Sequence, residues 1–517
     1  MSRIKRFVHI LASSYASLGA GVVSTLVSVP MALHFLPRAQ FGLWAVMTQA
    51  ISYIALIDAG MTGAVARHLI DHKDHPAGGD YGSVILTGNL VWLIQGAIVF
   101  PVGFALGPWL AQLLAIPSDL QHEFVVLVRW QSAIVAFGFA TRLWSQIIYA
   151  HQRIDLANYA TILGCAINLL ILWIAFVWGQ GVYSILWAGG IGTIVGQSLL
   201  FLVCWRCKMF PPRGAWGRPT WARFKQLFHY GKDVFLVTMG SQLASASQTI
   251  VITRTLGLDA AAVWSVCTKL FLFAGELIWR VSNYAEPMFA EMMTRGEHNL
   301  LRTRFRDVVT ISGTMSVWVA VGLALGNAPF VHVWTAGKIY WSPWNDVLLG
   351  IWLVTRSIIR CHVNLILISK KIGFLRFIVF AEGVLFVVLA LLVSRWGGIP
   401  AIVGASILCS LFLTGDYSAR TNAKYLGYSR REVVLDWSKG LVRISVLLIA
   451  LALLTWCVCL PLPVKWRLAC DSIVIGIGGG LLWLRYGIPA EIQAEVLAHL
   501  PAAFTVLLGR VFLRQDT

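Results

Sequence analysis

The stretch 205–232, WRCKMFPPRGAWGRPTWARFKQLFHYGK, divides this chain. It carries seven Lys or Arg residues and three Trp, and the chain on either side of it is too apolar for a soluble protein. Pro211, Pro212 and Pro219 interrupt a continuous helix, and the charge keeps the stretch out of the bilayer core. We therefore expect residues 206–232 to form a basic cytoplasmic linker between two membrane-embedded halves.

The composition predicts a membrane protein that crosses the bilayer many times. Of 517 residues, 58% are hydrophobic and only 12% are charged, about half the charged share of soluble domains. Apolar segments of about twenty or more residues, each long enough to cross the hydrocarbon, recur along the chain. The expected spans are 8–33, 41–66, 82–108, 122–149, 155–177, 183–204, 233–252, 260–288, 308–326, 346–369, 373–393, 399–419, 440–460 and 468–485. The predicted fold is an all-α polytopic membrane protein with about 14 transmembrane helices.

The net charge of +18 follows from the loops rather than from a nucleic-acid surface. With these spans, the loops on one side carry 26 Lys or Arg and those on the other side carry six. Basic loops face the cytoplasm in membrane proteins, so both termini are predicted to be cytoplasmic. No nucleic-acid partner is expected. The apolar run after the basic N-terminus is too long for a cleaved signal and is expected to be the first span.

The sequence offers no motif for catalysis, metal binding or a cofactor. HExxH, GxSxG, DxD and P-loop patterns are missing. Cys204 and Cys207 have CxxC spacing without a second pair, and His68 and His72 lack the glutamate of a zinc protease helix. No enzyme activity, metal or cofactor is predicted.

Two anchors indicate an internal repeat. Leu43–Val46 (LWAV) recurs as Val263–Val266 (VWSV), at an offset of 220 positions. Ile154 precedes Trp178 by 24 positions, and Ile372 precedes Trp396 by the same number. Six spans per repeat insert both copies in the same orientation, as in transporters that rock about a central cavity.

The expected domain organisation follows from the repeat and from the basic linker. It has five parts: an N-terminal six-helix lobe at 1–205, the linker at 206–232, a C-terminal six-helix lobe at 233–420, two additional transmembrane helices at 421–486, and a cytoplasmic or interfacial tail at 487–517.

Positive charge at membrane depth is the strongest candidate for a binding site. Arg356 and Arg360 lie about ten residues into their span and share one helix face. An arginine in the bilayer faces water, protein or a ligand rather than lipid, and its planar fork matches phosphate. The alternative for each of these cations is an interhelical salt bridge. The candidate anion-binding residues are Arg356, Arg360, Lys269, Arg280, Arg129 and Arg142.

Two carboxylates within spans are candidates for coupling to a proton or another ion. Asp58 lies in the second span and Glu382 in the eleventh. Ionisable groups in spans mark functional sites by default. For Asp58 the alternative is a position near the cytoplasmic end of its span, where the carboxylate reaches the head groups.

The chain resembles the polysaccharide-type (oligosaccharide, O-antigen) flippases of the multidrug/oligosaccharidyl-lipid/polysaccharide exporter superfamily. The resemblance lies in Phe41–Trp44 (FGLW), in Leu56–Met61 (LIDAGM), and in the repeat copy at Leu256–Leu258 and Val263–Leu270. It covers residues 1 to about 425. Spans thirteen and fourteen resemble those of fourteen-span members, in which they can form a lipid-facing groove.

The resemblance implies a bacterial inner-membrane flippase that alternates between inward- and outward-open states around a central cationic cavity. Its substrate would be an oligosaccharide on an undecaprenyl pyrophosphate carrier, destined for surface polysaccharide such as lipopolysaccharide. The implied partners are this lipid-linked oligosaccharide, membrane lipids and a polysaccharide polymerase or ligase. The alternative is a cation-coupled multidrug or organic-cation exporter of the same superfamily, which would be expected to hold acidic residues in its first span; this first span has none.

Overall fold

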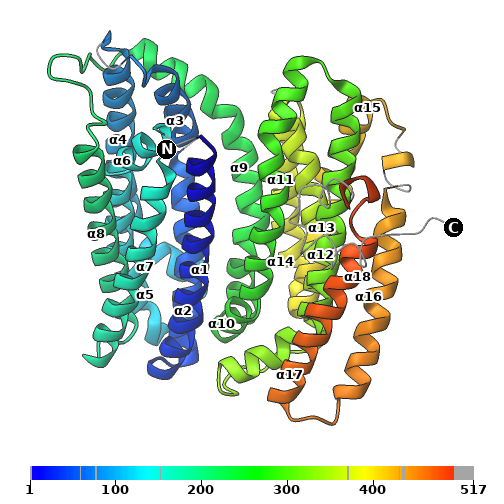
Figure 1. Ribbon diagram of the computed structural model, residues 1–517. Helices are drawn as coiled ribbons and strands as arrows, with labels where there is room; N and C mark the ends of the chain where they lie inside the picture. The colour runs from blue at the N-terminus through cyan, green and yellow to red at the C-terminus, as the bar shows by residue number, and fades with distance from the viewer. Residues whose placement is uncertain are drawn as a thin grey trace. The chain divides into compact units, whose positions relative to one another are not determined.

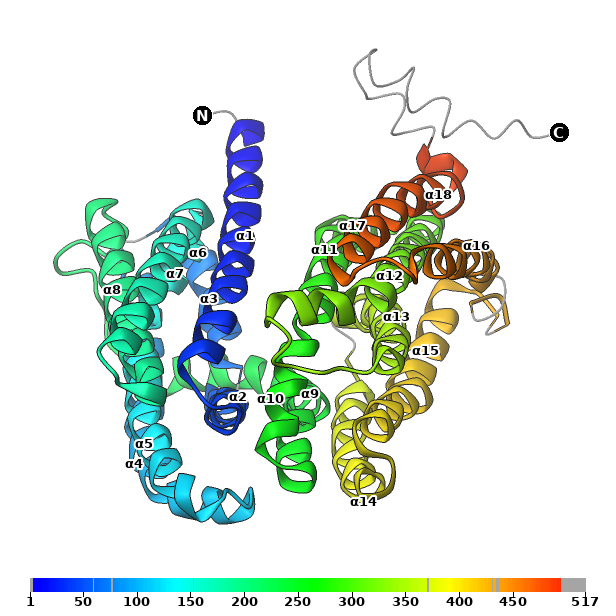
Figure 2. The ribbon, with the colours of Figure 1, turned by 90° about the horizontal axis from the view of Figure 1, so that it is seen from below.

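The computed structural model describes residues 3–58, 60–75, 78–151, 153–369, 372–429, 431–433 and 437–493. Within these ranges the chain is helices and their connections, and no strand occurs. The chain forms two compact units, Met1–Ala262 and Val263–Thr517. Each unit is a bundle of long helices (Figures 1 and 2). The all-α polytopic fold predicted from the sequence is confirmed. The tail predicted at 487–517 lies outside the described residues from 494 onward.

The first unit is built on two helix pairs, α4 with α5 and α7 with α8, and α1 packs on α7. Its helices are α1 (Arg3–Phe35), α2 (Arg38–Ile54), α3 (Met61–His72), α4 (Asp80–Leu113), α5 (Ser118–Ala140), α6 (Leu143–Ala150), α7 (Ile154–Val177), α8 (Ser184–Arg206) and α9 (Trp221–Leu256). Short helical turns at Ala55–Asp58 and Gly181–Tyr183 join some of them. The core between α3, α4, α5 and α6 contains Tyr81, Trp92, Phe139 and Ile147, all fully buried.

The second unit is centred on α12, which packs on α11, α13 and α16. Its helices are α10 (Leu258–Cys267, which spans the boundary between the units), α11 (Lys269–Arg295), α12 (His298–Trp334), α13 (Pro343–Ile368), α14 (Leu375–Ser410), α15 (Asp416–Leu426), α16 (Ser438–Cys459), α17 (Val464–Ile473) and α18 (Gly480–Tyr486). The helices α16 and α17–α18 lie together beside α12 (Figure 2). The outer side of α16 exposes Val442, Val446, Ile449 and Leu453, as a lipid-facing helix does.

Eleven helices of the described chain are long and apolar enough to cross a membrane, or twelve if the bent pair α10–α11 forms one span. The count of 14 is not confirmed, for two reasons. The predicted span 41–66 falls on α2, a short turn and the start of α3, none of which passes the length test alone. Leu375–Leu426 is counted once, although Gly398 has a left-handed φ of 56° that kinks it. The predicted spans 373–393 and 399–419 lie on either side of that kink.

The basic stretch 205–232 packs against the start of α4, in the first unit. The Tyr81 hydroxyl donates to the Met209 carbonyl at 3.0 Å, and the Ser83 hydroxyl donates to the Arg218 carbonyl at 2.9 Å. Arg223 forms an ion pair with Asp80 at 2.5 Å. The stretch is therefore held by specific contacts of its backbone. Whether it also divides the chain into functional lobes stays a prediction.

A break in the membrane-spanning segment α10–α11 occurs at Thr268, where the chain bends by 41°. A carbonyl freed at such a break needs a new donor, since hydrocarbon supplies none. The Asn327 amide of α12 donates to the Cys267 carbonyl at 3.0 Å, and to the Asp346 carboxylate at 2.6 Å. The Trp341 indole donates to the same carboxylate oxygen at 2.7 Å. This buried polar cluster fixes the break against α12 and α13.

Gly82 provides a test of how the basic stretch packs. A Cβ at Gly82 would overlap the backbone of Trp216, so Gly82→Ala must displace the stretch from α4. Overpacking of this kind costs about 1–3 kcal/mol. We expect Gly82→Ala to unfold at a lower temperature in detergent and to be cleaved faster by trypsin within 205–232.

Gly138→Ala on α5 is the matched control, because a Cβ there meets no atom within 4 Å. Equal protease resistance of Gly82→Ala and the control would mean that the stretch does not pack on α4 as described.

Candidate functional site

The six candidate cations fall into two groups, one in each unit, and the two groups differ in how their charge is compensated. Arg129 and Arg142 belong to the first unit. Lys269, Arg280, Arg356 and Arg360 belong to the second.

Asp58 is the centre of a complete hydrogen-bond network in the first unit. Its carboxylate accepts from Arg142 at 2.9 Å and from the Trp92 indole at 3.2 Å. The Thr62 hydroxyl donates to it at 2.7 Å, and the Thr62 backbone N–H at 3.1 Å. Arg142 in turn lies over the Phe139 ring, 4.2 Å from its centroid. Asp58 and Arg142, predicted separately as a coupling carboxylate and an anion ligand, are thus each other's partner in this structure.

The other candidate in the first unit, Arg129, has neutral partners within the part of the chain that the structure describes. Its Nε donates to the Phe104 carbonyl at 3.3 Å, and its guanidinium lies 4.4 Å from the centre of the Phe104 ring. These contacts hold the α4–α5 pair together at the level of Phe104. They leave the remaining guanidinium N–H groups of Arg129 for other acceptors.

Arg356 and Arg360 lie on α13 between α14 and α11. Arg356 is 3.9 Å from the Glu382 carboxylate of α14, which accepts a hydrogen bond from Ser410 at 2.6 Å. Arg360 lies over the Trp279 ring of α11, 4.6 Å from its centroid. The buried Nε of Arg360 has no hydrogen-bond acceptor within the described chain. Each of the two guanidinium groups thus has one carboxylate in its vicinity, Glu382 for Arg356 and Glu286 of α11 for Arg360.

One turn beyond Arg360, Asn364 joins α13 to α11 through polar side chains. Its amide donates to Glu286 at 2.9 Å, to Ser282 at 3.1 Å and to Asn283 at 3.3 Å. The sequence analysis did not select Asn364 or Asn283. The spacing could have revealed Asn364, because positions 356, 360 and 364 recur every four residues along one helix face.

Lys269 lies at another level of the membrane from these arginines. The helices α11 and α13 run parallel, since Gly275 faces Leu353 and Trp279 faces Arg360. Lys269 precedes Gly275 by six residues and Arg356 follows Leu353 by three. Nine residues of helix separate the two cations along the axis by about 13 Å. The sequence predicted one head-group site for all three residues, whereas this spacing keeps Lys269 apart from the pair.

One face of α11 carries a line of polar side chains. Lys269, Glu276, Arg280 and Asn283 follow one another at intervals of seven, four and three residues, which is the spacing of a single helix face. Glu276 and Asn283 are exposed and Arg280 is half-buried, with its guanidinium 3.4 Å from the Tyr284 hydroxyl. Charged side chains on a membrane-spanning helix face water or protein rather than lipid.

The described residues contain no group of three or more His, Cys, Asp or Glu side chains that could hold a metal ion. His68 and His72 lie on α3 with ring centroids 6.4 Å apart, and the His72 ring is hydrogen-bonded to the His68 carbonyl at 2.9 Å.

A family model described as "polysaccharide biosynthesis protein" matches residues 34–346. The chain belongs to this family. The match covers α2 to α12 and the start of α13, so it includes both the Asp58–Arg142 pair and the polar face of α11. A comparison with curated proteins finds no match.

Solved structures of transporters share the fold of this family member. The inward-facing multidrug MATE transporter of the MOP superfamily aligns with a TM-score of 0.67 and 14% identity, over 78% of this chain and 95% of its own. Lipid II flippase MurJ, in its inward closed conformation, aligns with a TM-score of 0.64 and 11% identity, over 92% of this chain and 99% of its own. A MOP-superfamily transporter from Pyrococcus furiosus aligns with a TM-score of 0.56 and 14% identity, over 82% and 97% of the two chains.

The predicted membership in a polysaccharide biosynthesis family is confirmed, and the predicted fold is that of the MOP-superfamily transporters. The chain belongs to a polysaccharide biosynthesis family and has the fold of MOP-superfamily transporters, with eleven or twelve described helices able to cross a membrane. Low sequence identity means that the solved structures establish the fold alone.

The Asp58–Arg142 contact predicts a strong asymmetry between single and double substitutions. Arg142→Gln leaves the Asp58 charge half-buried without its cation, and we expect a loss of about 2–4 kcal/mol of stability. Arg142→Gln/Asp58→Asn removes both charges and should recover part of that loss. The measurement is thermal unfolding of the purified variants as a double-mutant cycle.

Arg129→Gln serves as the control, because this substitution removes the contacts with the Phe104 carbonyl and ring and breaks no described ion pair. If Arg142→Gln were no less stable than Arg129→Gln, the ion pair would not contribute to the fold.

Proposed function

We propose that this chain is a flippase that moves an undecaprenyl-pyrophosphate-linked oligosaccharide across the bacterial inner membrane for surface polysaccharide biosynthesis. It would work by alternating access around a cationic, water-filled cavity lined by α11 and α13. Family membership supports the role in polysaccharide biosynthesis, and the fold shared with lipid II flippase MurJ supports translocation of a lipid-linked substrate.

The observation that carries the proposal is the incomplete hydrogen bonding of two adjacent guanidinium groups, those of Arg356 and Arg360. Glu382 lies 3.9 Å from Arg356, Glu286 interacts with Arg360, and the buried Nε of Arg360 lacks an acceptor in the described chain. Two like charges one turn apart repel each other unless an anion lies between them. A pyrophosphate supplies two adjacent groups of acceptor oxygens, which suits two guanidinium forks better than one carboxylate does.

The polar groups next to Arg360 suit the sugar that follows the pyrophosphate. Asn283 is exposed on α11, and Glu286 and Asn364 form a hydrogen-bonded pair beside it. Amide and carboxylate groups of this kind donate to and accept from hydroxyl groups. The polar face of α11 supports an aqueous path for the glycan, while the polyprenyl tail would stay in lipid. Lys269, about 13 Å along the helix axis, would contact the pyrophosphate at another stage of its passage.

The roles of the remaining candidates follow from their contacts. Glu382, hydrogen-bonded to Ser410 and near Arg356, is the better candidate for coupling to a proton or another ion, because substrate and carboxylate would compete for the same arginine. Arg280 and Arg129 are proposed as weaker contacts for the anionic substrate.

Asp58 and Arg142 neutralise each other, so the first unit's candidate carboxylate is not available to an organic cation. This disfavours the drug exporter.

The proposed location follows the charge asymmetry of the loops. The chain would lie in the inner membrane with both termini in the cytoplasm. Its product would appear at the outer leaflet, where a polysaccharide polymerase or ligase must consume it.

Binding to the lipid-linked oligosaccharide tests the proposal. We expect saturable binding to the purified protein, weakened about tenfold or more in Arg356→Gln/Arg360→Gln because two charge-assisted phosphate contacts are lost. Arg356→Lys/Arg360→Lys keeps both positive charges but not the planar guanidinium groups. Its affinity should lie between that of the wild type and that of Arg356→Gln/Arg360→Gln. Binding is measured by microscale thermophoresis with the labelled carrier.

Arg206→Gln/Arg213→Gln, which removes two exposed cations outside the proposed site, is the control and should bind as wild type does. Equal binding by wild type and Arg356→Gln/Arg360→Gln, or displacement of the carrier by a lipophilic cation, would overturn the flippase proposal and favour the exporter.

A further inference from the structure

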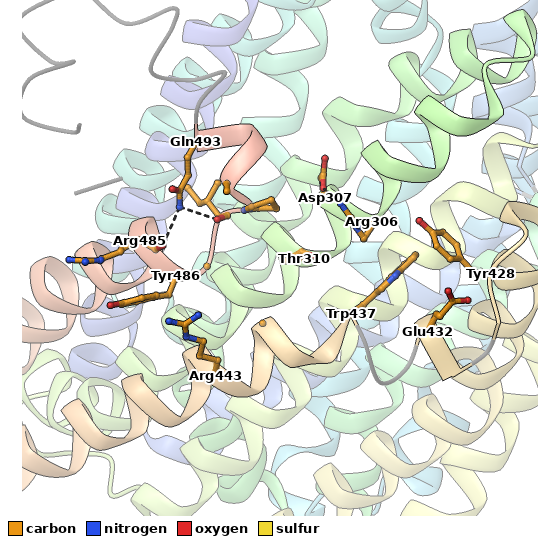
Figure 3. Close-up of a pocket in the computed structure, with 15 residues that line it drawn as sticks. Arg306, Asp307, Thr310, Tyr428, Glu432, Trp437, Arg443, Arg485, Tyr486 and Gln493 are labelled. Carbon is orange, nitrogen blue, oxygen red and sulfur yellow. Dashed lines mark hydrogen bonds and ion pairs between the residues drawn. The ribbon is translucent and has the colours of Figure 1, made fainter. Parts of the chain in front are cut away.

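A pocket of about 440 Å³ lies in the second unit, away from Arg356 and Arg360. Its walls come from the first part of α12, the start of α16, the end of α18 and the segment 487–493. Figure 3 shows Arg443, Arg485 and Tyr486 on one side and Arg306, Trp437 and Tyr428 on the other. The two additional transmembrane helices, α16 and α17–α18, thus contribute about half of a cavity that the proposed transport path does not use.

The pocket carries more positive than negative charge. Arg443 and Arg485 lie on the same aromatic ring, that of Tyr486, at 4.6 and 5.5 Å from its centroid. Neither has a carboxylate partner within the described chain. Two cations held on one ring repel each other, and an anion between them would relieve the repulsion.

The two acidic side chains of the pocket are already engaged. Asp307 is 2% exposed, with Arg306 at 3.7 Å and Arg304 at 3.9 Å. The Glu432 carboxylate accepts from the Ser429 backbone N–H at 2.7 Å. One carboxylate is therefore shared between two arginines and the other belongs to a local turn. Among the described residues, no carboxylate pairs with Arg443 or Arg485.

The walls are held in place by contacts of their own. Gln493 donates to the carbonyls of Leu484 and Ile488 at 2.9 and 3.0 Å, so the carbonyls at the end of α18 are used within the wall. Trp437 stacks on His362 at 6.2 Å. Trp437 is also the N-cap of the 22-residue α16 and supplies no side-chain acceptor there, so the positive end of this helix borders the pocket at Gly440.

We propose that this pocket binds the phosphate head group of an anionic phospholipid of the surrounding bilayer. Three arginines and a helix N-terminus provide the phosphate contacts, and Tyr428, Trp437 and Tyr486 supply the aromatic ring surface usual at a membrane interface. From the pocket, α16 continues with the exposed apolar residues Val442, Val446 and Ile449, along which the acyl chains can lie. This apolar continuation favours a lipid phosphate over free phosphate. The site anchors the two additional helices to the leaflet.

Native mass spectrometry of the full chain with defined lipids tests the proposal. Wild type should retain phosphatidylglycerol in preference to phosphatidylcholine. Arg443→Gln/Arg485→Gln should lose at least about tenfold of that preference, since each basic residue near an anionic head group contributes about 1 kcal/mol. Arg206→Gln/Arg213→Gln, which removes two exposed charges from the first unit, is the matched control and should retain it.

A second variant removes the cavity without changing its charge. A Cβ at Gly440 meets no atom within 4 Å, so Gly440→Phe can fill the pocket without a backbone clash, and lipid retention should fall as in the double variant. Equal retention by wild type and Gly440→Phe would overturn the proposal, whether or not Arg443→Gln/Arg485→Gln folds.

Competition with inorganic phosphate distinguishes a lipid head group from free phosphate as the ligand of this pocket. Millimolar phosphate should not displace phosphatidylglycerol; displacement would assign the pocket to a soluble phosphate and overturn the lipid proposal. No oligosaccharide carrier is used, so these outcomes are independent of the proposed function.

Discussion

The constraint on which this structure depends is the lack of hydrogen-bonding partners in hydrocarbon. Every break in a membrane-spanning helix and every charge at membrane depth must be satisfied from within the protein or from a water-filled space. At Thr268 the chain bends, and the Asn327 amide bonds the freed Cys267 carbonyl. At Asp58 four donor contacts converge on one carboxylate. At both positions, side chains from other helices supply the hydrogen bonds that hydrocarbon cannot.

The two units apply this constraint differently. In the first unit Asp58 and Arg142 form a close, hydrogen-bonded ion pair. In the second unit Arg356 lies near Glu382 and Arg360 interacts with Glu286, yet Arg360 keeps a buried Nε without an acceptor in the described chain. A buried cation whose hydrogen bonds are incomplete lowers the stability of the fold. The retention of the two arginines in a membrane-spanning helix is consistent with an anionic ligand that binds there.

The sequence predicted the class of fold well because hydropathy reports directly on which segments tolerate hydrocarbon. It could not locate interruptions that leave hydropathy unchanged. The apolar run 41–66 divides into α2, a turn and α3, with Gly60 at a φ of 76°. The kink at Gly398 was located, because it falls between the predicted spans 373–393 and 399–419, next to Arg395 and Pro400.

The candidate site was predictable to the extent that it lies on one helix. Four-residue spacing identified Arg356 and Arg360 as neighbours, and would have identified Asn364 also. Their partners on other helices, Trp279 and Glu382, follow only from tertiary packing. The pairing of Asp58 with Arg142, 84 positions apart, has no local signal in the sequence, so two residues predicted to act separately were found in contact.

The contacts between the basic stretch and α4 also bear on how the protein is made. Ser83 and Arg218 are 135 positions apart. The contact between them cannot form until most of the first unit has been translated. Domains generally fold as units, the N-terminal one first, during synthesis. Residues 209–218 therefore reach the start of α4 before α9, the last long helix of the first unit, has been made. The basic stretch closes onto α4 and sets the starting point from which α9 packs on α2, α3 and α4.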